Sequence, residues 1–77
     1  MFDYSRLYGK IKEVFNTQEA FAEAMGLSLS AINLRLNDKV KWKSPEIAKA
    51  CELLGVPISD AHLYFFEQKV VKTLQEV

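Results

Sequence analysis

The stretch that decides the fold is TQEAFAEAMGLSLSAINLRL, residues 17–36. Thr17 and Ser28 belong to the residue types that cap helix N-termini, because their hydroxyl accepts a hydrogen bond from a free backbone N–H in the first turn. Gly26 lies between them, where a helix commonly ends on a residue with positive φ. The stretch therefore predicts two short helices joined by a tight turn, which is the helix-turn-helix pattern.

Apolar spacing gives each of these two helices an inward face. In the first helix, Phe21, Ala24 and Met25 share one side, and in the second, Ile32 and Leu36 are four residues apart. Side chains three or four positions apart lie above one another on a helix. We therefore expect these residues to dock both helices on a shared core.

Three further helices are expected around this pair. From residue 3 to residue 15, apolar residues recur at spacings of three and four, which is the period of a helix with one buried face. Ser44 caps the next helix, Pro45 begins it and Gly55 ends it, and a cap signal near Asp60 starts the last helix. The core-facing residues expected on these last two helices are Ile47, Ala50, Cys51, Leu54, Tyr64, Phe65 and Phe66, and the last helix also carries Leu63. The fold class is thus all-α, a compact domain of five helices.

The last ten or so residues suit either of two conformations. The apolar residues keep helical spacing with Phe66, but the run from Val70 to Thr73 also suits a strand. This C-terminal segment offers enough apolar surface for a homodimer interface. The residues of that interface would be Tyr64, Phe65, Phe66, Val70, Val71 and Leu74, and Val77 continues the helical spacing.

Length and composition limit the number of domains and the kinds of site and partner that the chain can have. A chain of 77 residues has room for one domain, which we assign to residues 1–77. Ten basic residues balance ten acidic ones, so attraction to nucleic acid has to come from local charge. One cysteine excludes an internal disulfide, and a lone His62 gives no zinc-ligand spacing. No apolar run approaches the roughly 20 residues that span a bilayer, so we expect a cytoplasmic protein without membrane contact.

Other features of the sequence predict no enzyme. There is no glycine-rich phosphate loop and no nucleophile with a base at plausible spacing, so we expect neither catalysis nor a cofactor nor a metal. Cys51 is expected to be a small buried hydrophobe. Trp42 is expected to fold back and close the core with its indole N–H bonded, the alternative being a ring that stacks on DNA.

The helix-turn-helix residues resemble those of phage repressor and Cro proteins. That resemblance rests on Thr17-Gln18-Glu19, Phe21-Ala22, Met25-Gly26-Leu27-Ser28, Ile32 and Leu36-Asn37. A wider pattern, formed by Met1–Ser5, Val40–Lys43, Cys51–Gly55 and Tyr64–Phe66, resembles a family of small prophage-encoded regulators from Gram-positive bacteria. The resemblance implies a transcriptional regulator in which the helix at residues 29–37 enters the major groove of double-stranded operator DNA.

The resemblance also implies which residues contact DNA. Gln18 matches a glutamine that contacts the phosphate backbone, and Ser28, Leu29, Ser30 and Asn33 match positions that face bases or phosphates. The full set of candidate residues is Gln18, Ser28, Leu29, Ser30, Asn33, Leu34, Arg35, Asn37, Lys39, Lys41 and Lys43.

Helical geometry assigns roles to the outer face of the second helix. If Ile32 docks it, Leu34 projects outward with Asn33 and Arg35 on the two flanks. Asparagine can pair with adenine, arginine with guanine or a phosphate, and an apolar side chain with a thymine methyl. The lysines that follow, together with Arg35, form the only cluster of one sign in the chain and predict phosphate contacts that weaken with salt.

Two functions remain open on these residues. The first is a sequence-specific DNA-binding regulator that acts as a dimer on a two-fold operator. The second is a protein-binding modulator, an antirepressor or corepressor, that covers the DNA-reading surface of a phage repressor. Zero net charge and the apolar outer face made by Ala31 and Leu34 motivate the second function. Leu34 is the residue on which the two functions divide.

Overall fold

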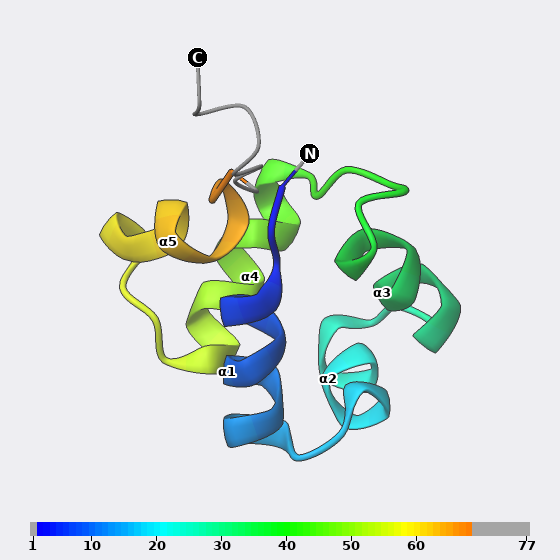
Figure 1. Cartoon of the computed structure of the whole chain (residues 1–77). Coiled ribbons are helices and arrows are strands. Elements are labelled where there is room, and N and C mark those ends of the chain that lie inside the picture. Colours follow the sequence, from blue (N-terminus) through cyan, green and yellow to red (C-terminus); the bar gives the residue numbers. More distant parts are fainter. Residues whose placement is uncertain (1, 69–77) are drawn as a thin grey trace.

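Five α-helices and one short 3-10 helix follow one another in residues 2–68, the part of the chain that the computed structural model describes. Their bounds are α1 Ser5–Phe15, α2 Gln18–Met25, α3 Leu29–Leu36, α4 Ser44–Leu54, η1 Ile58–Asp60 and α5 Ala61–Phe65 (Figure 1). The predicted all-α class with five helices is confirmed. An isolated antiparallel bridge between Phe2 and Gln68 joins the two ends of the described part.

The predicted caps and turn around α2 and α3 are confirmed. Thr17 Oγ1 accepts a hydrogen bond from the backbone N–H of Ala20 at 3.1 Å, and Ser28 Oγ accepts one from Ala31 at 3.1 Å. Gly26 ends α2 with a φ of 75°, in the left-handed region. These contacts involve only near neighbours in the sequence, so the residue types were sufficient to predict them.

The start of α4 differs by one residue from the sequence prediction. Lys43, not Ser44, is the N-cap residue, and Ser44 is already helical. The reason is Glu46, whose Oε1 reaches back to accept the backbone N–H of Lys43 at 3.0 Å. Gly55 ends the helix with a φ of 70°, as predicted.

The last helix is shorter than expected. The 3-10 turn η1 leads into α5, which ends at Phe65. The prediction that Phe66 faces the core is wrong, because Phe66 lies beyond the helix, out of phase with it, and its ring is exposed. That ring meets the ring of Phe2 edge-on, with centroids 6.0 Å apart. The expected tail residues Val70, Val71, Leu74 and Val77 lie outside the described residues.

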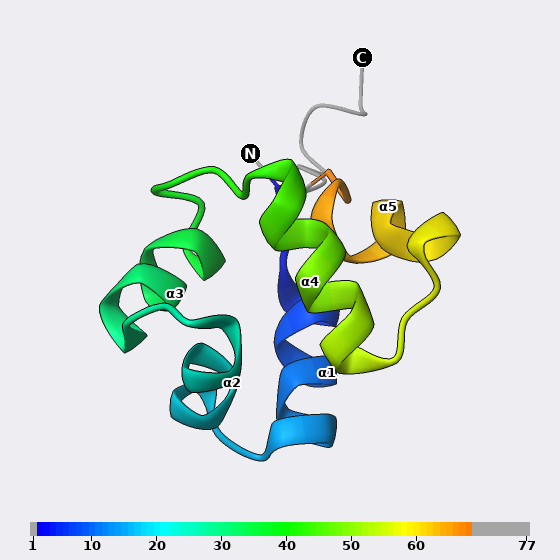
Figure 2. The same ribbon diagram turned by 180° about the vertical axis from the view of Figure 1, so that it is seen from behind.

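The core lies between α1, α2, α4 and α5, and α3 stands at one edge. Figures 1 and 2 show α1 and α4 in the middle with α3 packed beside α2. The largest fully buried side chains are Phe21, Phe65, Leu7, Ile11 and Ile32. On α2, Ala22 is buried and Ala24 is only half-buried, so the expected inward position of Ala24 is correct only in part. The edge position of α3 leaves its outer face accessible.

Trp42 closes the core as expected, but no described residue accepts a hydrogen bond from its indole N–H. The ring meets Phe65 edge-on, with centroids 5.1 Å apart, and Nε1 is buried without a hydrogen-bond partner among the described residues. Residues 2–68 therefore do not bear out the prediction of a bonded N–H, and the ring belongs to the apolar core. Cys51 is buried, as predicted, and burial raises the pKa of its thiol. Within residues 2–68, no helix combines the length and the apolar character needed to cross a membrane.

Candidate interaction surface

The outer face of α3 is an exposed surface with two leucines on it. Leu29 is 37% exposed and Leu34 is 46% exposed, while Ser30 and Asn33 are exposed beside them. Ile32 is fully buried, so it docks α3 and turns Leu34 toward solvent. The structure thus brings these four candidate residues together on one face, which we call the α3 face.

Arg35 does not belong to the α3 face. The residue is only 8% exposed, and its guanidinium donates to both carboxylate oxygens of Glu46, from Nε at 3.0 Å and from NH2 at 2.9 Å. NH1 donates to the backbone oxygen of Ala31 at 2.9 Å. The predicted position of Arg35, on an accessible flank of the outer face, is therefore wrong. Arg35 follows Ile32 by three residues, which puts it near the docked side of the helix, and the carboxylate from α4 holds it there.

The Arg35–Glu46 pair makes stability depend on pH. Hydrogen bonds from Arg35 lower the pKa of Glu46 below its ordinary value, even though burial acts in the opposite direction. A carboxyl whose pKa is lower in the folded state stabilises the fold above its unfolded pKa, about 4.3, and loses that contribution as pH falls through the folded pKa. The structure therefore predicts that acid weakens this link between α3 and α4.

We expect the free energy of unfolding to fall more steeply on acidification in the parent protein than in a Glu46→Gln variant. The gap between the two should narrow from about pH 5 to about pH 3, because the parent carboxyl is protonated over that range. Urea unfolding at pH 7, 5 and 3, monitored by circular dichroism, measures the free energy of unfolding of the parent and of the variant. If the free energy of unfolding fell equally in the two proteins between pH 7 and pH 3, the assigned role of Glu46 would be contradicted.

The predicted basic cluster is reduced to the three lysines after α3, because Arg35 is buried. Lys39, Lys41 and Lys43 are all exposed in the segment between α3 and α4. Asp38, at the start of this segment, has a φ of 59° and accepts the backbone N–H of Phe2 through Oδ2 at 3.1 Å. These three exposed lysines follow α3 in the chain, and we call the segment that carries them the basic loop.

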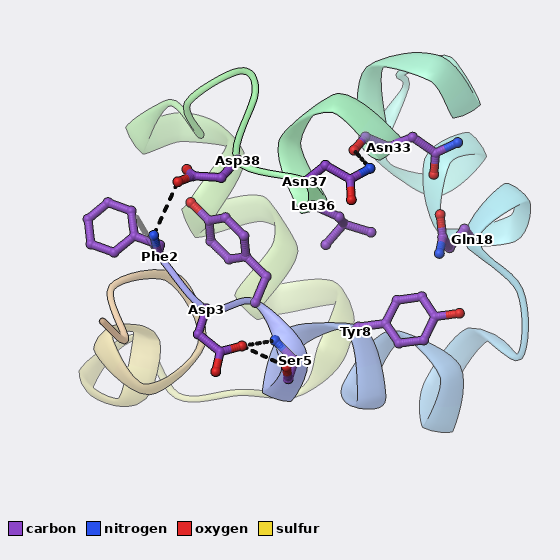
Figure 3. Close-up of a pocket in the computed structure, with 10 residues that line it drawn as sticks. Phe2, Asp3, Ser5, Tyr8, Gln18, Asn33, Leu36, Asn37 and Asp38 are labelled. Carbon is purple, nitrogen blue, oxygen red and sulfur yellow. Dashed lines mark hydrogen bonds between the residues drawn. The ribbon is translucent and has the colours of Figure 1, made fainter. Parts of the chain in front are cut away.

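Three further candidates have structural duties or lie elsewhere. Ser28 caps α3, and Asn37 donates through Nδ2 to the backbone oxygen of Asn33 at 2.8 Å. Gln18, expected to contact phosphate, is half-buried and lines a pocket of about 510 Å³ that also contains Asp38 (Figure 3). A carboxylate in the same pocket is unfavourable for a phosphate beside Gln18.

The pocket is the part of the surface that sequence reasoning missed. It lies between the start of α1, the start of α2 and the end of α3, and Tyr4, Tyr8 and Asp38 contribute to its lining. Tyr4 and Tyr8 lie 30 or more positions before Asp38 in the sequence, and the hydrogen bond from Phe2 to Asp38 has a separation of 36. No spacing rule within one helix could have joined them.

Comparisons with known proteins give a family and a similar solved structure. A family model described as "Protein of unknown function (DUF739)" matches residues 1–68, and the chain belongs to that family. The chain is similar to the modulator of repression (MOR) of the temperate bacteriophage TP901-1 from Lactococcus lactis, known from a solution structure. The two are 51% identical over 91% of this chain and 95% of that chain, with a TM-score of 0.76. No curated protein matches the sequence.

These similarities support the expected relationship to phage regulators of Gram-positive bacteria. They do not confirm the narrower placement among repressor and Cro proteins, since the similar structure is described as a modulator of repression.

Proposed function

We propose that this protein is a modulator that binds a phage repressor through the α3 face, the second of the two functions left open by the sequence. The observation that carries the proposal is the composition of that face. Leu29 and Leu34 are exposed on it, and Arg35, the cation expected to read a base or a phosphate, is buried against Glu46. Reading of base edges depends mainly on polar side chains, and this face offers Ser30 and Asn33 for that purpose.

The energetics of the α3 face favour a protein partner. Burying a fully exposed leucine contributes roughly 1.5 to 3 kcal/mol, so burying the parts of Leu29 and Leu34 that are still exposed, 37% and 46%, contributes less than half of that for each. Apolar residues surrounded by polar ones are typical of protein interfaces. Operator DNA would cover Leu34 with little apolar surface beyond a thymine methyl. A partner helix that buries both leucines would gain more.

The similarity to the TP901-1 modulator of repression supports the choice of partner. That protein is described as acting on repression, and its structure matches this chain over nearly all of both lengths. A repressor presents its own DNA-reading surface, and a modulator that covers it would compete with the operator.

The test is the affinity for the repressor of the phage or prophage that carries the gene, measured by isothermal titration calorimetry. Leu34→Glu should weaken binding at least about tenfold, because it removes the apolar contact and places a desolvated carboxylate where the interface buries a leucine. Val14→Glu is the matched control, since Val14 is an equally exposed apolar residue, 45% against 46%, on α1. Normal binding by Leu34→Glu, or equal losses in both variants, would contradict the proposed face.

DNA binding is the second candidate, and the three exposed lysines of the basic loop favour it. If Lys39, Lys41 and Lys43 contact phosphates, binding to operator-region DNA should weaken steeply between two salt concentrations. Their joint replacement by glutamine should abolish that binding and leave repressor affinity nearly unchanged.

A further inference from the structure

Neither candidate function yet explains the charge and the lining of the pocket next to the α3 face. Figure 3 shows Tyr8 and Gln18 on one side of it, and Asn37 and Asp38 on the other, from the end of α3. Asn33 belongs both to the α3 face and to the pocket lining. A partner seated on the α3 face would therefore reach the mouth of the pocket.

The electrostatics at the α3 end of the pocket favour a cation. Asp38 places a carboxylate there, which accepts the backbone N–H of Phe2 at 3.1 Å. Burial, and after it the nearby Asp38 carboxylate, raises the pKa of Tyr4. The C-terminal end of α3 adds the partial negative charge of the helix dipole, and the carbonyls of Asn33, Leu34 and Arg35 there accept backbone N–H groups. The described residues that line the pocket include no lysine and no arginine. Both sources of charge act in the same direction.

The walls of the pocket suit a flat cation with several donors. Tyr8 is 47% exposed and offers a ring face, and the side-chain oxygens of Gln18, Asn33 and Asn37 are hydrogen-bond acceptors. A guanidinium stacks on aromatic rings and carries five N–H donors in a planar fork, whereas an ammonium is a compact, strongly hydrated charge. Arginine therefore fits this lining better than lysine.

We propose that this pocket binds an arginine side chain from the DNA-reading surface of the repressor. The inference rests on the proposed function, and charge complementarity selects the occupant. Surfaces that bind DNA carry arginine and lysine for the phosphates and bases, and an acidic pocket opposite them takes the place of the DNA. The leucines of the α3 face supply apolar contact, and the pocket supplies selectivity for a basic partner.

The pocket is tested first without the repressor, by nuclear magnetic resonance titration of the labelled protein with N-acetyl-arginine amide. Saturable shifts are expected at the amides of Phe2, Tyr8, Gln18 and Asp38. N-acetyl-citrulline amide, which has the same shape without the charge, should give no saturable shift. Equal effects of the two probes, or shifts scattered over the surface, would overturn the pocket's selectivity.

Asp38→Asn is the variant that removes the charge with least disturbance. Asparagine keeps an acceptor for Phe2 and tolerates the φ of 59°. It should abolish the arginine shifts and leave the melting temperature close to that of the parent. An unchanged titration in this variant would overturn the role of Asp38.

The same variant in the repressor assay separates the two proposals. We expect repressor binding about tenfold weaker for Asp38→Asn, with a smaller difference at high salt. If Leu34→Glu weakens binding and Asp38→Asn does not, the pocket proposal fails and the proposed function stands. If neither variant weakens binding, the proposed function fails, and the pocket proposal fails with it.

Discussion

Replacing Glu46 with alanine is expected to lower the free energy of unfolding by about 3 kcal/mol. Glu46 accepts two hydrogen bonds from Arg35, and the side chains of the pair are 10% and 17% exposed. Without the carboxylate, the guanidinium charge of Arg35 stays buried and uncompensated. The ion pair that links α3 to α4 is also lost. Urea unfolding at pH 7 measures the change.

A double substitution provides the control for this prediction. Arg35→Met combined with Glu46→Leu removes both charges and keeps apolar volume, so most of the lost stability should return. A loss of less than about 1 kcal/mol in Glu46→Ala would mean that Arg35 readily leaves its site for solvent. In that case Arg35 would again be available to the α3 face, and the case for DNA binding would become stronger.

The second large effect concerns Trp42. Trp42→Ala is expected to lower the free energy of unfolding by about 3 to 5 kcal/mol, because it leaves a cavity against Phe65. Trp42→Phe should cost much less, about 1 kcal/mol, because it keeps an aromatic ring and removes an indole N–H that has no partner among the described residues. Both variants can be measured by the same urea unfolding.

The ratio of the two Trp42 effects is the informative quantity. If Trp42→Phe costs as much as Trp42→Ala, the indole N–H contributes a hydrogen bond after all. If both variants unfold like the parent, the ring does not close the core.

Sequence reasoning succeeded where the physical cause is local. Thr17 and Ser28 cap helices by bonding N–H groups three residues away, and Gly26 and Gly55 end helices by adopting a positive φ. These effects need only the residue and its neighbours in the chain. Leu34 was correctly placed outward, because its angular position follows from the docking of Ile32 in the same helix.

Sequence reasoning failed where the outcome depends on the exact end of a helix or on the groups that surround a side chain. Phe66 was assigned to the core by continuing a helical period, but α5 ends one residue earlier. Trp42 was correctly assigned to the core, but the partner expected for its N–H depended on the groups around the ring. In each case the error lies in the surroundings of the side chain and not in its chemistry.

The sequence by itself determined the all-α class, the turn between α2 and α3 and the exposed leucine at position 34, because capping and helical phase are local properties. Only the tertiary structure determined that Arg35 is buried and that the acidic pocket forms. Arg35 is buried because a carboxylate eleven residues away, on another helix, offers it two acceptors. Asp38 lines a pocket because the start of the chain passes beside it. Such contacts depend on how helices pack in space, which neither spacing nor composition encodes.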